Sequence, residues 1–137
     1  LALVFFLEHA DRDKSDKTCK QRAELASEGV IPLLVDMLKI DEVCADAALA
    51  LRNLARNTDI KVSIAREGAV GPLIALLKNG SDEGKTNAAA ALWNLTFNAE
   101  SKAKVKESLS SIKEAYKATT SGSTAKSDMK WLLNRLA

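Results

Sequence analysis

The stretch "EGAVGPLIALLK", residues 67–78, decides how the chain is organised, because a second copy of it lies earlier in the sequence. "EGVIPLLVDMLK", residues 28–39, aligns with it without gaps at an offset of 39. A second pair follows, in which "AALALRNLARN", residues 47–57, aligns with "AAAALWNLTFN", residues 88–98, at an offset of 41. Unrelated segments rarely agree in order, spacing and apolar phase together. The chain therefore contains an internal repeat of about 40 residues.

Each copy has the pattern of a short helix, a glycine corner and two longer helices. Gly68 is expected to end the short helix and to adopt a positive φ. Three leucines from residue 73 onward then form the i, i+3, i+4 stripe of an amphipathic helix. Ser81 or Asp82 is expected to cap the third helix, and Asn57 and Asn98 are expected to be turn or N-cap residues after the third helices.

The two ends of the chain continue this pattern imperfectly. "KESLSSIKEAYK", residues 106–117, lacks the corner glycine and is expected to run as one bent or continuous helix. "TTSGST", residues 119–124, predicts a loop, and "KSDMKWLLNRL", residues 126–136, predicts the final helix, in which Asn134 repeats Asn94 at an offset of 40. The irregular last unit, with its polar Lys and Ser substitutions, is typical of a capping repeat.

The repeat pattern divides the chain into four parts. Residues 1–15 are expected to be the third helix of an incomplete repeat, 16–56 and 57–98 two repeats, and 99–137 a degenerate C-terminal or capping repeat. The chain begins with Leu1 and continues as "LALVFFL", an apolar run that would be exposed at a natural terminus. We therefore expect a fragment of a longer solenoid in which a preceding helix covers this run.

The composition indicates an all-helical protein of the cell interior. Apolar residues make up 47% of the chain but aromatic residues only 4%, and two prolines and six glycines interrupt it. The formal charge of +2 and the lack of a block of like charge argue against strong attraction to nucleic acid or membranes. Cys19 and Cys44 are isolated, which favours a reducing compartment. We expect a cytoplasmic location, with the nucleus as a second one, and no membrane span.

These observations together resemble the armadillo repeat family. The residues that carry the resemblance are "EGAVGPLIALLKNGSDEGKTNAAAALWNLTFNAESKAKV" and the weaker copy "EGVIPLLVDMLKIDEVCADAALALRNLARNTDIKVSI". The match is strong over residues 16–107, and HEAT repeats are the alternative. The resemblance implies an all-α fold, a right-handed solenoid of three-helix repeats. It is closer to catenin-like and vacuolar-type members than to importin-α, because Leu49 and Ala90 stand where import receptors have Trp four residues before the Asn.

Both third helices contain an Asn that lies away from the apolar stripe. At about 100° per residue, Asn94 falls on a different face from Leu92 and Leu95. The resemblance implies that the third helices line a concave groove, as in armadillo repeat proteins, and that Asn side chains in this groove bind the backbone of an extended peptide. The matching residues are Asn53, Asn94 and Asn134, whose amides offer both donor and acceptor. The alternative interpretation is that these amides bond to neighbouring helix backbone.

Larger side chains flank the Asn positions. Trp93 and Arg52 occupy equivalent places, and Trp93 is a candidate anchor for a ligand side chain, since Trp and Arg are frequent at binding hot spots. The alternative is a Trp that packs between repeats. Arg52, Arg56 and Arg135 would favour an acidic peptide, although isolated arginines on helices are often only solvated.

The residues that catalysis requires are missing from the sequence pattern. His9 is the single histidine, and no nucleophile, phosphate-loop or metal-ligand spacing is present. We therefore predict a protein that is not an enzyme, without metal or cofactor: a scaffold that binds an extended segment of a partner protein. The alternative is a structural cap or self-association segment of a larger solenoid, which would associate through the apolar N-terminal helix. No basic stripe with interleaved aromatics supports nucleic-acid binding.

Overall fold

The computed structural model describes residues 29–137, and within that range the chain is entirely helical, without β-strands. In chain order the helices are α3 (Val30–Met37), α4 (Cys44–Leu54), α5 (Thr58–Arg66), α6 (Val70–Asn79), α7 (Asp82–Leu95), α8 (Ala99–Lys106), α9 (Leu109–Ala118) and α10 (Thr124–Leu136). The N-terminal segment expected to be a third helix lies outside the described residues, and the boundaries of the four parts remain a prediction.

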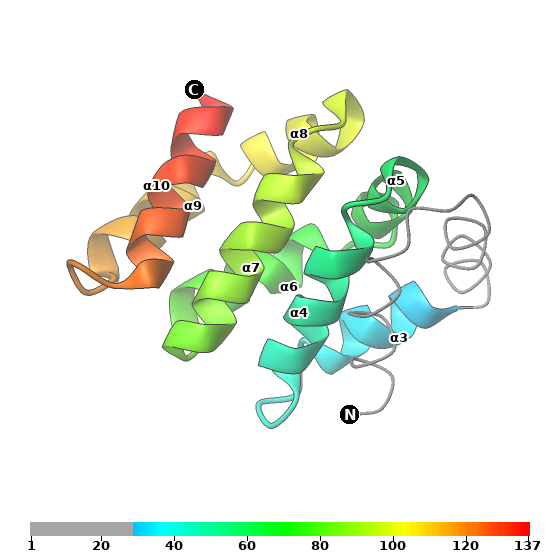
Figure 1. Cartoon of the computed structure of the whole chain (residues 1–137), viewed down its shortest axis with the longest axis horizontal. Helices are drawn as coiled ribbons and strands as arrows, with labels where there is room; N and C mark the ends of the chain where they lie inside the picture. The colour runs from blue at the N-terminus through cyan, green and yellow to red at the C-terminus, as the bar shows by residue number, and fades with distance from the viewer. Residues whose placement is uncertain (1–28) are drawn as a thin grey trace.

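The helices form repeated units stacked side by side (Figure 1). The unit α5, α6 and α7 is followed by α8, α9 and α10, and α3 with α4 supplies the second and third helices of the preceding unit. The third helices α4, α7 and α10 form one layer with α7 in the centre, in contact with both neighbours. The second helices lie behind them. The predicted all-α solenoid of three-helix repeats is confirmed.

Small apolar side chains allow the third helices to approach one another closely. Ala88, Ala89 and Ala91 of α7 are at most 1% exposed. Leu92 and Leu95, on the same helix, are fully buried. Burial of one leucine side chain contributes about 1.5–3 kcal/mol, so α7 is the central element of the core, positioned by α4 on one side and α10 on the other.

The corner between the first and second helices is built in two ways. Gly68 has φ +82°, as predicted for the residue that ends the short helix. The corresponding corner of the last unit has no glycine and was expected to be helical throughout, but α8 ends at Lys106 and α9 begins at Leu109. Ser108 turns the chain at φ −100° and ψ 18°, and its carbonyl accepts the first hydrogen bond of α9. This turn needs no positive φ and therefore forms without a glycine, so the prediction of one bent or continuous helix was wrong.

Polar side chains cap the helices that follow the turns. The Ser81 hydroxyl accepts a hydrogen bond from the backbone N–H three residues later, at 3.1 Å, and so caps α7. Asn98 caps α8 in the same way at 3.0 Å, and Asn57 accepts from the third residue after it at 3.2 Å. The predicted capping roles of these three residues are confirmed.

A line of polar contacts joins the first helices α5 and α8. The Arg66 guanidinium donates to both carboxylate oxygens of Glu100, over 3.0 and 3.1 Å. This hydrogen bonding lowers the pKa of Glu100 below its ordinary value. The Ser101 hydroxyl donates to the backbone carbonyl of Lys61 over 3.4 Å. The repeats are therefore connected by polar groups at the first helices as well as by apolar contacts in the core.

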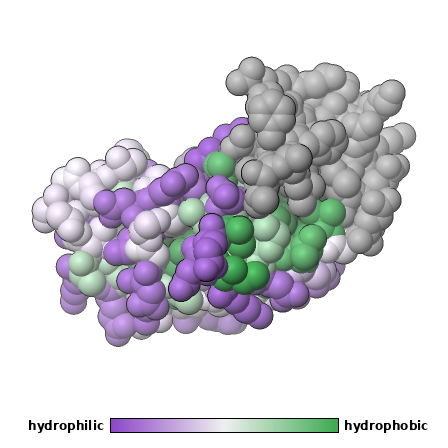
Figure 2. Space-filling model, turned by 90° about the horizontal axis from the view of Figure 1, so that it is seen from below, coloured by the Kyte–Doolittle hydropathy of each residue, from purple (hydrophilic) through white to green (hydrophobic). Residues whose placement is uncertain are grey.

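The outer surface changes character along the solenoid. Figure 2 shows apolar surface gathered toward α3, whereas polar surface covers the end formed by α9 and α10. Leu33 and Ile40, on α3 and the turn after it, are 53% and 48% exposed. Of the helices α3 to α10, none combines the length and the apolar character needed to cross a membrane.

Candidate functional site

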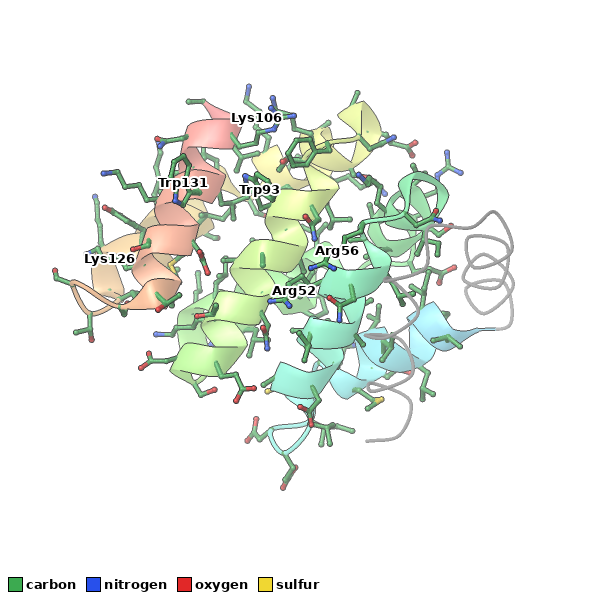
Figure 3. All side chains as sticks on the ribbon, in the orientation of Figure 1. Arg52, Arg56, Trp93, Lys106, Lys126 and Trp131 are labelled. Atoms are coloured by element: carbon green, nitrogen blue, oxygen red, sulfur yellow. The ribbon has the colours of Figure 1, made fainter. Side chains whose placement is uncertain are left out.

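The third-helix face, defined here as the outward surface of α4, α7 and α10, carries the predicted site residues (Figure 3). Arg52, Arg56 and Trp93 lie on this face, together with Trp131 of α10, which the sequence pattern did not single out. Trp93 is 39% exposed and Trp131 66% exposed, both unusual for the largest apolar side chain. Arg56 is exposed and Arg52 half-buried.

Asn94 stabilises the end of the third helix in the preceding repeat. Its Nδ2 donates to the backbone carbonyl of Arg52 over 3.0 Å, from α7 to α4. In a longer helix this carbonyl would accept from the N–H of Arg56, but that N–H bonds to the carbonyl of Asn53 instead. Asn94 therefore satisfies one of the carbonyls that a helix end leaves without an intrahelical donor. This contact is the structural role that the sequence left open as an alternative.

A second amide makes the same contact two helical turns earlier. Asn87 Nδ2 donates to the carbonyl of Ala45 over 3.2 Å, and both partners lie seven residues before Asn94 and Arg52. Seven residues are close to two turns of about 3.6 residues, so the two bonds hold α4 and α7 in one register. Asn87 is 6% exposed and was missed by sequence reasoning. The signal that marks it is a polar residue directly before the buried alanine run.

The two predicted amides differ in what they offer to a ligand. Asn53 is only 4% exposed, whereas Asn94 is half-buried. Among residues 29–137 the bond to Arg52 is the only hydrogen bond of the Asn94 side chain, so its Oδ1 keeps its accepting capacity. Asn94 can therefore serve the α4 helix end and a bound peptide at once, while Asn53 presents little surface.

The burial pattern of α10 places Asn134 at a different repeat position from the one expected. The four buried residues of α10, namely Ala125, Met129, Leu132 and Leu136, all correspond to buried residues of α7 at an offset of 41. At an offset of 40, Ala125 would fall on half-buried Lys85 and Leu136 would fall beyond the end of α7. With this register Arg135 stands at the place of Asn94, and Asn134 at the place of Trp93. Asn134 is exposed and makes no side-chain hydrogen bond to any described residue.

The end of α7 compensates for the missing third amide. The carbonyl of Trp93 corresponds to that of Arg52, but Arg135 occupies the position of Asn94 in the next repeat, so an Asn is missing there. It accepts instead from the Thr96 hydroxyl at 2.5 Å and from the Thr96 N–H at 3.1 Å. The corresponding residue on α4 is Ala55, which has no hydroxyl. The end of α4 thus receives a donor from the next repeat, and the end of α7 receives one from Thr96, directly after the helix.

An aromatic pocket lies between α7 and α10 on the third-helix face. It has a volume of about 300 Å³ and is lined by Ala89, Ala90, Trp93, Asp128 and Trp131. The two alanines leave room beside the two indoles, because Ala90 stands where α10 carries Trp131. A larger depression of about 650 Å³, lined mainly by the α3–α4 turn and α6, contains no aromatic side chain. The smaller pocket is therefore the stronger candidate site.

Asp128 gives the aromatic pocket one acidic group. Partial burial raises the pKa of this carboxyl above its ordinary value, and the positive charge of Arg52 offsets part of the rise. Arg52 comes from α4 and Asp128 from α10, so charges from both outer third helices act on each other across α7. The carboxylate is poised to interact with a positively charged or hydrogen-bond-donating group that enters between the indoles.

The pocket continues into an aromatic and basic cluster at the ends of α7 and α10. The Trp93 and Phe97 rings meet edge to face, with centroids 4.6 Å apart and planes at 81°. The Arg135 guanidinium lies 4.3 Å from the Phe97 ring centroid, and the Lys61 ammonium lies 5.7 Å from it. Both distances are within the range of cation–π attraction. Phe97 thus contacts Trp93 and both cations.

The chemistry of this face is that of recognition. Among residues 29–137 no three His, Cys, Asp or Glu side chains gather into a group that could hold a metal ion. The groups at the pocket and beside it are aromatic faces, amides, arginines and the Asp128 carboxylate. Such groups fix the position and identity of a bound segment.

Comparison with known proteins identifies similar repeats. Residues 18–56 and 57–97 match the Armadillo/beta-catenin-like repeat family, and together these matches cover more than half of the chain. No curated protein matches the chain.

Several solved structures are similar to the chain over nearly its whole length. One is a designed armadillo repeat protein, with 22% identity, a TM-score of 0.73 and coverage of 96% of this chain and 63% of that one. Another is a designed armadillo repeat protein in complex with the peptide (KR)4, with 23% identity, a TM-score of 0.77 and coverage of 98% and 63%. A third was computationally designed for modular peptide recognition, with 23% identity, a TM-score of 0.74 and coverage of 94% and 56%. The chain thus spans less than two thirds of each of these structures.

Proposed function

Since the chain belongs to the Armadillo/beta-catenin-like repeat family, we propose that it is a protein-interaction scaffold whose third-helix face binds an extended segment of a partner protein. The observation that carries this proposal is the aromatic pocket between Trp93 and Trp131. Two partly exposed indoles over a floor of alanines resemble the desolvated anchor sites at which a few side chains supply most of the binding energy. A structurally similar designed protein binds a peptide, which is consistent with this role.

The chemistry of the pocket favours one kind of side chain. Its walls are apolar and aromatic, and Asp128 contributes a carboxylate. A side chain with an apolar stem and a positive end would bury the stem against the indoles and place its charge near that carboxylate. Lysine and arginine have this form. We therefore propose that a basic side chain of the partner occupies the pocket.

The polar groups beside the pocket suit the backbone of an extended peptide. Asn94 retains an acceptor on the third-helix face, and Asn134 at the edge of α10 offers a full amide. A peptide in extended conformation presents one N–H and one carbonyl per residue that must find partners when water is removed. The proposed role of these two amides is to supply them. Asn53 is too buried to contribute without a side-chain rearrangement.

A second candidate function is a structural one within a larger assembly. Leu33 on α3 and Ile40 in the turn after it are exposed apolar side chains. A second copy, or another part of a longer solenoid, would cover such surface. In that case Leu33→Ala would lower the association constant in sedimentation experiments, and variants of the aromatic pocket would leave it unchanged.

Peptide selection tests the principal proposal. The full chain would be used to select binders from a random peptide library, and the best binder would be measured by calorimetry against Trp93→Ala and Trp131→Ala. Each variant is expected to lose about 30-fold in affinity, the effect of a hot spot of roughly 2 kcal/mol. Leu33→Ala is the matched control, because it also removes an exposed apolar side chain and should change the affinity by less than about twofold. Unchanged affinity in both Trp variants would refute the proposal.

The remaining expectations follow from the same proposal. A scaffold of this kind needs neither a catalytic group nor a cofactor. We further propose that the protein acts in the cytoplasm, with the nucleus as a second location. These statements are part of the proposal, and the absence of enzymatic activity would be tested with the partner once it is identified.

A further inference from the structure

Lys61 is a buried cation that the fold of α5 does not explain. It is only 7% exposed, and burial lowers the pKa of its ammonium group. Among the side chains that the structure describes, none forms a hydrogen bond or ion pair with its Nζ. The one described interaction of this ammonium group is with the Phe97 ring, at 5.7 Å from the centroid. A buried charge without a counter-charge costs stability.

The helix ends near Lys61 do not need this charge. The last carbonyls of α7, those of residues 92 to 95, accept hydrogen bonds from Thr96, Phe97 and Asn98. The carbonyl of Arg52 at the end of α4 accepts from Asn94. A role for Lys61 as a helix cap is therefore excluded at these carbonyls.

A second cation shares the same aromatic ring. The Arg135 guanidinium lies 4.3 Å from the Phe97 centroid and is exposed, and the Phe97 ring itself is 50% exposed. Glu100, the acidic residue of α8, already accepts hydrogen bonds from Arg66 at both of its carboxylate oxygens. Two cations from α5 and α10 thus converge on one half-exposed ring next to Trp93, without a described carboxylate between them.

We propose that Lys61, Phe97 and Arg135 form a recognition point for an acidic side chain of the bound partner. This inference rests on the proposed function and adds to it, because it places a carboxylate of the partner next to the aromatic pocket. Exposed Arg135 could bond an arriving carboxylate in bidentate fashion, and the carboxylate would attract the charge of buried Lys61 from the surface without direct contact. The positive edge of the Phe97 ring also suits an anion. The partner segment would then carry an acidic residue near the basic one that enters the pocket.

The test compares two peptides and four variants of the full chain. Fluorescent oligoglutamate is the probe, and oligoglutamine of the same length is its uncharged control. Lys61→Met and Arg135→Met remove one charge each, and Lys61→Arg keeps the charge. Lys113→Met removes one exposed charge from α9, away from the cluster, and serves as the matched control for net charge.

The proposal predicts that oligoglutamate binds and oligoglutamine does not. Arg135→Met should weaken oligoglutamate binding by about 10- to 100-fold, the effect of losing one charge-assisted hydrogen bond of about 1.5–3 kcal/mol. Lys61→Met should weaken it by about 5- to 10-fold, the effect of removing one nearby charge worth about 1–1.4 kcal/mol. Lys61→Arg and Lys113→Met should remain within about threefold of the parent chain. Equal loss in Lys61→Met and Lys113→Met, or no binding of oligoglutamate to the parent chain, would overturn the proposal. Arg135→Met keeps the test decisive if Lys61→Met does not fold.

A titration separates a peptide carboxylate from a free anion. Oligoglutamate is expected to shift the Phe97 ring resonances in NMR spectra at concentrations at which sodium acetate and inorganic phosphate have no effect. Shifts caused by inorganic phosphate but not by oligoglutamate would overturn the assignment to a partner side chain. Failure of this proposal is distinct from failure of the scaffold function, because the latter is decided by the Trp variants and the selected peptide.

Discussion

Replacing Asn94 with Ala would test whether this amide stabilises the solenoid or only contacts a ligand. The substitution removes the donor that satisfies the Arg52 carbonyl at the end of α4, 3.0 Å from Nδ2. A neutral hydrogen bond contributes about 1 kcal/mol, and a carbonyl left without a partner costs more when it is buried. Because Asn94 is half-buried and water can reach part of the site, we expect the lost bond to cost about 1.5 kcal/mol.

A matched control isolates the hydrogen bond from helix propensity. Ala is a better helix former than Asn by roughly 0.6 kcal/mol, so the net loss for Asn94→Ala is expected to be about 1 kcal/mol. Asn134 lies near the end of α10 and makes no side-chain hydrogen bond to a described residue, so Asn134→Ala should gain up to about 0.5 kcal/mol. The two variants should therefore differ in opposite directions from the parent chain.

Urea denaturation followed by circular dichroism would measure both variants. Asn94→Ala should lower the unfolding midpoint with an unchanged m value, and its thermal midpoint should fall by about 3 °C. Equal free energies of unfolding for Asn94→Ala and Asn134→Ala would refute the structural role of Asn94. A loss of peptide affinity without any loss of stability would assign Asn94 to the ligand alone.

Four further substitutions test other features of the structure. Lys61→Met should be more stable than the parent chain at neutral pH. Because the folded-state pKa of Lys61 is lowered, the parent chain gains stability as the pH rises toward the ordinary lysine pKa. The stability advantage of the variant, measured by urea titrations at several pH values, should therefore shrink in that pH range. Asp128→Asn should likewise raise the free energy of unfolding at neutral pH, because the raised pKa of this carboxyl means that folding disfavours its charged form. This gain in stability should disappear below the ordinary aspartate pKa, where the carboxyl is neutral in both states. Gly68→Ala should lower the free energy of unfolding by about 1 kcal/mol, because φ is +82° there. Gly71→Ala, in the first turn of α6 and with equally free space around it, should raise it by about 0.5 kcal/mol. Thermal unfolding would measure both variants, and equal shifts would contradict the corner geometry.

Local sequence chemistry was sufficient to predict the architecture. The two gapless alignments define the repeat, Gly68 marks the corner, and Ser81 and Asn98 cap the helices they precede. These features depend on residues close together in the chain. They could be predicted because a helix end needs a donor, an acceptor or a positive φ at one particular position.

The register of the last helix could not be predicted in the same way. Leu132 and Asn134 match Leu92 and Asn94 in letters at an offset of 40, but burial follows an offset of 41. One residue on a helix is a rotation of about 100°, so two matching letters do not decide which face is buried. Trp131 carries the signal that could have corrected the alignment, because this exposed residue falls on buried Ala91 at an offset of 40 and on half-buried Ala90 at an offset of 41.

The candidate site depends on contacts between repeats that a single pattern does not contain. Trp131 borders a pocket because residue 90, at the same repeat position in α7, is an alanine. Lys61 lies near Phe97, which follows α7 at the far end of the same repeat, so this contact also joins residues that are distant in the sequence. Sequence periodicity identifies the exposed face of each helix, but the distance between faces follows from how the repeats stack.

The central claim is that the third-helix face binds the partner segment at the pocket of Trp93 and Trp131. The most direct measurement is the NMR titration of the two indole N–H resonances with the selected peptide. The account predicts that both resonances shift and saturate together at the affinity measured by calorimetry. Shifts confined to the α3–α4 turn and α6, with both indole resonances unchanged, would contradict it.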